Sequence, residues 1–203
     1  MARDVRERVI VATTLDRDDI IAGLRELIAE LRADGEVAGI RLVGGAALSL
    51  RYFDRGSTQD LDSLHVRPGS DAAVAAAAAR VAQHHDWDPA WLNFEVTKAD
   101  ALPTLGRTVE WDTIYDGDGI VIQVASKEAL LAMKLRANRP GRDTRDIRLL
   151  LSLCEIGTLG EVEDFYEDFY PGDSLDPRAV SMVTAIFAES AIEKPLPPGP
   201  MNF

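Results

Sequence analysis

The spacing of apolar residues predicts an alternation of helices and strands in the first part of the chain. Apolar side chains recur every three or four positions over residues 18–33, which predicts a helix that ends at Asp34-Gly35. Residues 40–43 form a short apolar run that breaks at Gly44-Gly45. We expect a buried strand there, a glycine turn, and then a helix that reaches about residue 53. Alternation over residues 60–66 predicts a second strand.

The pattern changes after this strand. An alanine-rich stretch over residues 70–84 predicts a helix. Residues 87–105 show no clear period, and we expect an irregular segment in which Trp87, Trp91 and Phe94 anchor a loop or a short strand. Residues 108–115 and 119–124 predict two strands joined by an Asp-Gly turn, a dipeptide that favours hairpins. Beyond them, helices are predicted at residues 126–138, 143–154, 159–170 and 177–189, and the proline-rich residues 195–203 are expected to be disordered.

This order of elements predicts an α+β fold in which helices flank a mixed sheet and a C-terminal helical bundle follows. We expect residues 1–125 to form the core, residues 126–194 the helical region and residues 195–203 the tail. A length of 203 residues suits one compact domain with a small helical appendage.

Composition is that of an ordinary globular protein. The chain is 46% hydrophobic and 28% charged, and its single cysteine, Cys154, leaves no disulfide to form, which fits a reducing cytoplasm. Residues 1–15 lack the apolar run of a secretory signal, and the longest apolar stretch, residues 72–79, is too short to cross a bilayer. We expect a cytoplasmic protein without a membrane span.

The charge is acidic overall and segregated along the chain. A formal net charge of -12 argues against broad, sequence-blind binding of nucleic acid, which depends on Lys and Arg neutralising phosphates. However, basic residues concentrate in residues 127–148 and acidic residues in residues 155–176. The basic cluster fits either a local cleft for an anion or a solvated helix face.

The candidate chemistry begins with two carboxylates, Asp60 and Asp62. Residues two apart on a strand point to the same face, roughly 6.5 to 7 Å apart, so both carboxylates are able to face one Mg²⁺ site. Nucleotidyl transfer needs such a site, because the metal neutralises charge on the triphosphate and on the leaving pyrophosphate.

Phosphate-binding groups are predicted beside these carboxylates. At Gly44-Gly45 the backbone amides approach a phosphate without hindrance, at the start of a helix whose partial positive charge favours anions. Arg55, Ser57 and Thr58 offer further phosphate donors in the following loop. Each piece alone is weak, since an Asp-x-Asp pair is more often a solvated turn.

The order of the pieces resembles the signature of the polymerase-beta-like nucleotidyltransferase superfamily. That signature consists of a strand, a Gly-Gly turn, a helix and a polar loop, followed by Asp60-Leu61-Asp62 at the start of a second strand. The segment Leu130 to Leu135, followed by Arg142-Asp143-Thr144-Arg145-Asp146, is similar to the second half of the bacterial abortive-infection toxins of the AbiEii and MenT kind. The resemblance implies that a helix lysine and a later aspartate, Lys134 and Asp146, complete the active site. In an otherwise apolar helix segment, Lys134 also needs solvent or an anion as partner.

The resemblance implies a Mg²⁺-dependent transfer of a nucleoside monophosphate from an NTP. As acceptor it implies a tRNA 3′ end, and as setting a toxin–antitoxin system with a cognate antitoxin. The residues themselves leave a small molecule, a protein side chain or a degenerate nucleotide-binding module open. They also leave the third carboxylate open between Glu110 and Asp112.

Two further groups of residues carry alternative interpretations. Asp143 and Asp146 lie one helical turn apart beside Arg142 and Arg145, so surface pairing competes with a catalytic role for Asp146. The chain's three histidines have no second ligand set near them in the sequence, and we expect structural or surface roles: His65, His84 and His85.

Overall fold

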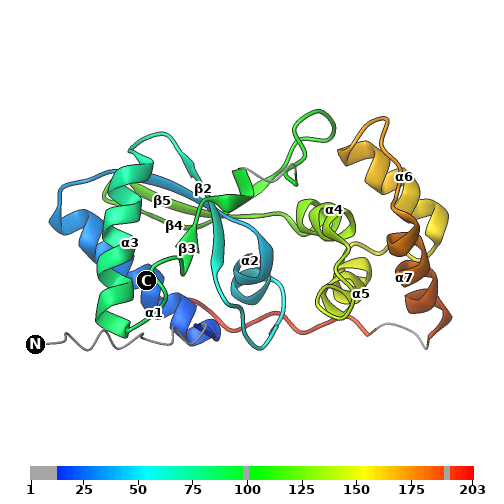
Figure 1. Ribbon diagram of the computed structural model, residues 1–203, viewed down its shortest axis with the longest axis horizontal. Coiled ribbons are helices and arrows are strands. Elements are labelled where there is room, and N and C mark those ends of the chain that lie inside the picture. The colour runs from blue at the N-terminus through cyan, green and yellow to red at the C-terminus, as the bar shows by residue number, and fades with distance from the viewer. Residues whose placement is uncertain (1–12, 98–100, 190–192) are drawn as a thin grey trace, which may run out of the picture.

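The structure is a computed structural model that describes residues 13–97, 101–189 and 193–203. In these ranges it has a five-stranded mixed sheet and seven α-helices (Figure 1). The predicted α+β class with a mixed sheet is therefore confirmed.

Two long helices pack together at one end of the molecule (Figure 1). Helix α1 (Arg17–Ala33) begins at a capping box between Asp16 and Asp19, which satisfies backbone N–H groups of its first turn. Helix α3 (Asp71–His85) lies where the alanine-rich sequence predicted a helix, and the Ser70 side chain caps its first turn. Trp87 packs against α1 at Gly23. A side chain would not fit there, because a Cβ on Gly23 would lie 2.8 Å from the Trp87 ring.

The sheet has the strand order β3-β2-β1-β5-β4. Strand β1 (Ala38–Leu42) lies between the antiparallel β2 (Leu61–Val66) and the parallel β5 (Ile120–Ala125). Strand β3 (Leu92–Asn93) pairs in parallel with β2, and β4 (Trp111–Gly117) forms a hairpin with β5. Because side chains alternate along a strand, Leu42 and Val124 share the buried face while Arg41 and Gln123 share the other.

The remaining helices connect the sheet to the other end of the molecule. Helix α2 (Gly44–Arg51) follows β1 directly and contacts β2, β5 and α4. Helix α4 (Lys127–Ala137) then packs on α5 (Thr144–Leu153) and α6 (Leu159–Phe169), and α7 (Pro177–Ala188) contacts α5 and α6 (Figure 1). None of the helices in the described ranges has the length and apolar character that a bilayer crossing requires.

The last residues, 193–203, contain no helix or strand and run back from α7 to α1 (Figure 1). The guanidinium groups of Arg17 and Arg25 donate to the carbonyls of Gly199 and Asn202, each at 2.5 Å. The Phe203 ring meets the edge of Tyr115, with ring centroids 5.8 Å apart. This segment, which composition predicted to be disordered, thus has defined neighbours on α1 and β4.

The structure differs from the expected elements at two places and completes a third. Helix α2 begins at Gly44, within the expected glycine turn, with Val43 as its N-cap. The segment expected to be irregular, with a loop or short strand, contains the two-residue strand β3 and a short 3₁₀ turn (Glu95–Thr97), and β3 is stabilised by its pairing with β2. Strand β4 begins at Trp111 instead of residue 108.

Candidate functional site

The two candidate metal ligands lie at the start of β2. Asp62 is the second residue of the strand and Asp60 comes just before it, and both side chains are half-buried. Asp62 is in register with Asn93 on β3, and the Asn93 amide donates a hydrogen bond of 3.2 Å to Asp60 Oδ2. Strand β3 therefore supports the aspartate pair from its outer side.

Gly44 contacts the aspartate strand directly. Its φ of +65° lies in the left-handed region, and a Cβ there would lie 2.7 Å from Asp62 Oδ2. The backbone N–H of Val43 donates to the Asp62 carbonyl at 3.0 Å. Only glycine satisfies both the backbone conformation and this close approach, so the glycine turn and the carboxylate are fixed against each other.

Gly45 packs closely against the polar loop that follows α2. A Cβ on Gly45 would lie 2.8 Å from Arg55 Nη1 and 2.9 Å from Thr58 Oγ1. The Thr58 hydroxyl in turn donates to the Asp60 carbonyl at 3.1 Å. Ser57 is exposed, and its carbonyl accepts a hydrogen bond from Arg55 Nη1 at 2.7 Å.

Asp60 and Asp62 carry uncompensated negative charge. Burial and the neighbouring Asp60 raise the pKa of Asp62, and the more distant Arg139, Arg142 and Lys134 offset this only in part. Within the described ranges, neither Asp60 nor Asp62 forms an ion pair. Two carboxylates that share a site with no cationic partner fit a hard divalent cation such as Mg²⁺, which prefers oxygen ligands.

Lys134 lies in a buried ion-pair network on the other side of the site. Its Nζ is 2.6 Å from Asp143 Oδ1 and 2.9 Å from Asp146 Oδ2, and Arg55 Nε is 2.9 Å from the same Asp146 oxygen. The side chains of Lys134, Asp143 and Asp146 are only 6%, 0% and 2% exposed. The network therefore joins α4, α5 and the loop after α2.

Asp143 is the most strongly bound carboxylate of this network. Burial alone would raise its pKa, but hydrogen bonds from Arg139 and Lys134 and the charge of Lys134 lower it from the ordinary value. Arg139 Nε lies 2.9 Å from Asp143 Oδ2, while about half of the Arg139 side chain stays exposed. Arg139 is thus anchored at one side and open to solvent at the other.

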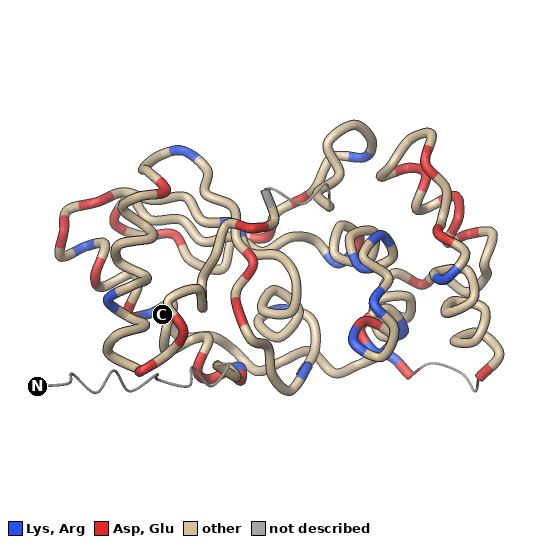
Figure 2. Tube along the Cα trace, viewed as in Figure 1, with Lys and Arg blue, Asp and Glu red and all other residues tan. Residues whose placement is uncertain are grey.

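A pocket of about 250 Å³ lies between the two groups. Gly44 and Asp62 line it from the sheet, and Lys134 and Arg139 line it from α4 and the following turn. Glu95 also lines it, and the rest of its wall is apolar, with Val43, Val96, Ala101, Leu130, Met133 and Ala137. Figure 2 shows Lys and Arg gathered along α4 and α5, and Asp and Glu on α6. A pocket with one acidic wall, one basic wall and an apolar floor suits a nucleotide chelating a metal.

The structure does not bring the two candidates for a third carboxylate to this site. Asp112 lies on β4, which β1 and β5 separate from β2, and its Oδ2 is 3.4 Å from both Arg51 Nε and the Tyr52 hydroxyl. Glu110 directly precedes β4. The strand that does neighbour β2 carries an amide, Asn93, in register with Asp62.

Sequence reasoning missed two features of the site. Asp143 and Asp146 were open to a surface-pairing explanation, but both are buried and bind Lys134. Their expected partner Arg145 instead donates to the carbonyls of Asp54 and Arg55, both at 3.2 Å. The second feature is the contact between Asn93 and Asp60, which no local pattern signals because it spans 33 positions.

Comparison with family models, with curated proteins and with solved structures found no match for this chain.

Proposed function

We propose that this protein is a nucleotidyltransferase, which moves a nucleoside monophosphate from an NTP to an acceptor hydroxyl and releases pyrophosphate. The observation that carries the proposal is the contact of Gly44 with Asp62 across a pocket from Lys134 and Arg139. It combines a phosphate-accessible helix start, the carboxylate of Asp62 and two cations around one cavity, with Asp60 two residues before Asp62.

Asp60 and Asp62 would hold Mg²⁺ in this proposal. When bound, the metal neutralises charge on the triphosphate and on the pyrophosphate that leaves. The chain's own part is to keep the two carboxylates close in spite of their repulsion, with Asn93 bonded to Asp60 and the Val43 amide bonded to the Asp62 backbone.

The other residues have separate roles. The N–H groups at the start of α2 bind phosphate oxygens, and Arg139, half-exposed at the pocket, contributes positive charge. Lys134 lines the pocket too, but two aspartates share its charge. Asp146 is therefore a positioning residue that holds Lys134 and Arg55. Arg55, Ser57 and Thr58 order the loop beside Gly45, and the Arg55 guanidinium is committed to Asp146.

Lys and Arg gather along α4 and α5 (Figure 2), and this positive charge supports an anionic acceptor. By its resemblance to the AbiEii and MenT toxins, we propose a tRNA 3′ end, in a cytoplasmic toxin–antitoxin system with a cognate antitoxin. The net charge of -12 favours the competing acceptor, a small hydroxylated molecule or a protein side chain.

One observation favours a second function, a module that binds nucleotide without turnover. The strand beside β2 offers Asn93 where a general base would be placed, and an amide does not accept a proton at neutral pH. Such a module would bind Mg²⁺ and NTP at the same residues and leave the acceptor unmodified.

The test is incubation of the purified protein with each α-labelled NTP, Mg²⁺ and total bacterial tRNA, beside Asp62→Asn and the control Asp112→Asn. Both variants lose one carboxylate from the sheet, but only Asp62 lies at the pocket. Label on tRNA with wild type and Asp112→Asn, but not with Asp62→Asn, is the expected result. Mg²⁺-dependent NTP binding without label on tRNA, protein or small hydroxylated molecules would favour the binding module. Absence of both binding and label would contradict the proposal.

A further inference from the structure

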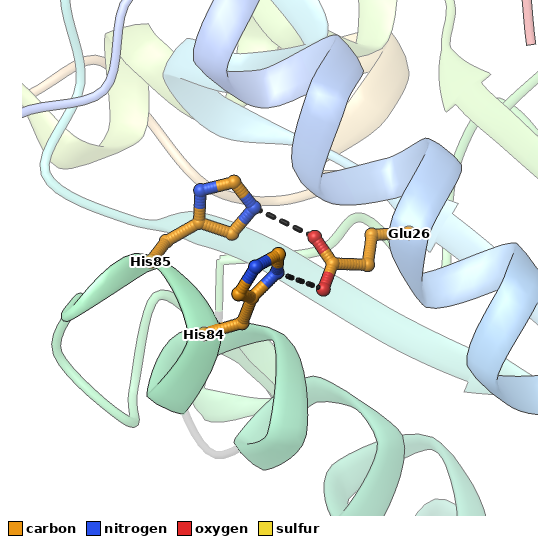
Figure 3. Close-up of side chains that lie close together, drawn as sticks. All are labelled: Glu26, His84 and His85. Atoms are coloured by element: carbon orange, nitrogen blue, oxygen red, sulfur yellow. Dashed lines mark hydrogen bonds and ion pairs between the residues drawn. The ribbon is translucent and has the colours of Figure 1, made fainter.

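A cluster of three side chains joins α1 to the end of α3 (Figure 3). Glu26 Oε1 lies 2.6 Å from His84 Nδ1, and Glu26 Oε2 lies 2.7 Å from His85 Nε2. The sequence placed both histidines in structural or surface roles because no further ligand accompanied them. The structure supplies that ligand from α1, 58 and 59 positions away.

The convergence of two neighbouring histidines on one carboxylate is the notable feature. Consecutive residues of an α-helix point about 100° apart, so His84 and His85 would normally face different neighbours. They are the last two residues of α3, and Asp86, with a left-handed φ of 56°, ends the helix directly after them. Figure 3 shows both rings turned toward Glu26.

The donor set matches a transition-metal ion. One atom each from Glu26, His84 and His85 lie within 4.8 Å of one another. Bonds of about 2.0–2.2 Å to a tetrahedral Zn²⁺ require donor separations of about 3.3 Å. The Glu26–histidine distances of 2.6 and 2.7 Å must therefore lengthen, and any wider separation within the 4.8 Å limit must shorten, changes that side-chain rotation provides. Imidazole nitrogens favour Zn²⁺, Cu²⁺ and Ni²⁺, whereas Mg²⁺ prefers oxygen ligands throughout.

We propose that Glu26, His84 and His85 form a binding site for a divalent transition-metal ion, with Zn²⁺ as its representative. The two imidazole nitrogens and one carboxylate oxygen are the protein ligands, and solvent completes the coordination. Each bound ring keeps its proton on the nitrogen that faces away from the metal.

Packing holds part of the site in place before any metal binds. The His85 ring stacks on Trp87, with ring centroids 4.3 Å apart and an interplanar angle of 18°. Trp87 rests against Gly23 on α1, where a Cβ would lie 2.8 Å from its ring. His84 is 72% exposed, so solvent and ions reach the cluster directly.

Other ion pairs near α1 and α3 lack a set of metal ligands. Arg80 on α3 binds Glu30 on α1 and Asp34 at the end of α1, and a guanidinium has no lone pair for a metal. His65 lies 2.6 Å from Asp71, but it is a single imidazole with a single carboxylate. Among the described residues, the Glu26 cluster alone groups three metal-binding side chains of this kind.

A metal bound at this cluster would join α1 to α3, at a place separate in the sequence from Asp60 and Asp62. A ligand that binds only the folded state stabilises it by mass action, so Zn²⁺ should raise the unfolding temperature. The proposal is independent of the nucleotidyltransferase assignment, because none of its three residues lines the pocket beside Asp62.

The test is calorimetric titration of untagged, chelator-treated full-length protein with Zn²⁺, with excess Mg²⁺ present to mask sites made of oxygen ligands. We expect one Zn²⁺ per chain from the cluster, and affinity at least about tenfold weaker in His84→Ala and in Glu26→Gln. Co²⁺ should give the visible absorption of a nitrogen- and oxygen-ligated ion in wild type and lose it in His84→Ala. Cys154 is a poor competitor, because burial raises the pKa of its thiol to about 12.

His65→Ala is the matched control, since it removes a histidine that also contacts a carboxylate. It should bind Zn²⁺ as wild type does. Since His84 is exposed, its replacement by alanine should leave the fold intact, as circular dichroism would verify. Equal Zn²⁺ affinity in wild type and His84→Ala, or no saturable binding in wild type, would overturn the proposal. Wild-type affinity for Zn²⁺ with no rise in unfolding temperature would mean that the unfolded chain binds the ion equally well, and would contradict a site assembled by the fold.

Discussion

The protein contains two pairs of aspartates whose surroundings are opposite. Asp143 and Asp146 are buried, and Lys134, which lines the pocket, contacts both of them. Asp62 lines the same pocket and Asp60 lies two residues before it; both are half-buried, and within the described ranges neither has an ion-pair partner. The first pair has a cationic partner in direct contact, and the second has none.

This difference separates stability from function within one site. A buried charge that has lost its partner is costly, so the Lys134 network should matter most to folding. Two neighbouring carboxylates without a cation repel each other, so the Asp60–Asp62 pair should lower stability while it creates affinity for a metal ion. The variants below test each half of this comparison.

The largest expected effect is on activity. The double variant Asp60→Asn, Asp62→Asn should lower nucleotidyl transfer by about a thousandfold or more, because a bound metal supplies several kcal/mol of charge stabilisation. Initial rates with the α-labelled NTP that wild type uses measure it. Asp112→Asn on β4 should keep wild-type activity, and a similar loss in that variant would remove the distinction between the carboxylates.

The next effect is on stability. Asp143→Asn removes the carboxylate that lies 2.6 Å from Lys134, with a side chain that is 0% exposed, and should cost about 3 kcal/mol of unfolding free energy. Urea unfolding followed by circular dichroism measures the change. Asp112→Asn, which loses an exposed ion pair with Arg51 and changes a long hydrogen bond from Tyr52, should cost about 0.5 kcal/mol or less. Equal midpoints for the two variants would contradict a structural role for the Lys134 network.

A smaller effect is expected at the glycine turn. Gly44→Ala forces a side chain into the left-handed region and against Asp62, and should cost about 1–2 kcal/mol. Gly45→Ala is the matched change one residue later, where the Cβ meets Arg55 and Thr58 but the backbone lies outside the left-handed region. Gly44→Ala should therefore unfold at lower urea concentration than Gly45→Ala, and the reverse order would refute the close contact with Asp62.

The smallest effect is a difference in the sign of pH dependence. The pKa of Asp143 lies below its ordinary value of 3.8, so its contribution to stability is present above pH 3.8 and is lost as the pH falls through the folded-state pKa. The pKa of Asp62 lies above 3.8, so its contribution is present below pH 3.8 and is lost as the pH rises through the folded-state pKa.

These signs predict opposite effects of the two substitutions on stability at neutral pH. Asp62→Asn should be at least as stable as wild type at pH 7, whereas the deficit of Asp143→Asn at pH 7 should shrink toward pH 3. Urea midpoints of the three proteins across this range measure both. A destabilised Asp62→Asn would mean that Asp62 is held by contacts that favour its charged form.

Much of the secondary structure could be predicted because it depends on local pattern. The period of α1, the apolar run of β1 and the Asp-Gly turn between β4 and β5 are each visible in a short window of sequence. Strand β3 could be predicted only as a loop or short strand, because two residues carry no period and its stability comes from pairing with β2.

The site could be predicted only in part, for the same reason. Gly44 and Asp62 follow from a local order of turn, helix and strand. The pairing of Lys134 with Asp143, the bond from Asn93 to Asp60 and the meeting of Glu26 with His84 depend on tertiary packing, which decides which charges are neutralised. Sequence identified residue types with the right chemistry, and packing decided which of them retain charge for a ligand.

The most direct test of the central claim is calorimetry of a non-hydrolysable NTP analogue with wild type and Asp62→Asn, each with and without Mg²⁺. We predict binding to wild type that requires Mg²⁺, and binding to Asp62→Asn that is weaker by about tenfold or more and no longer depends on the metal. Wild-type binding that is equally tight with and without Mg²⁺, or a Mg²⁺-dependence that persists in Asp62→Asn, would contradict a metal site at the unpaired aspartates.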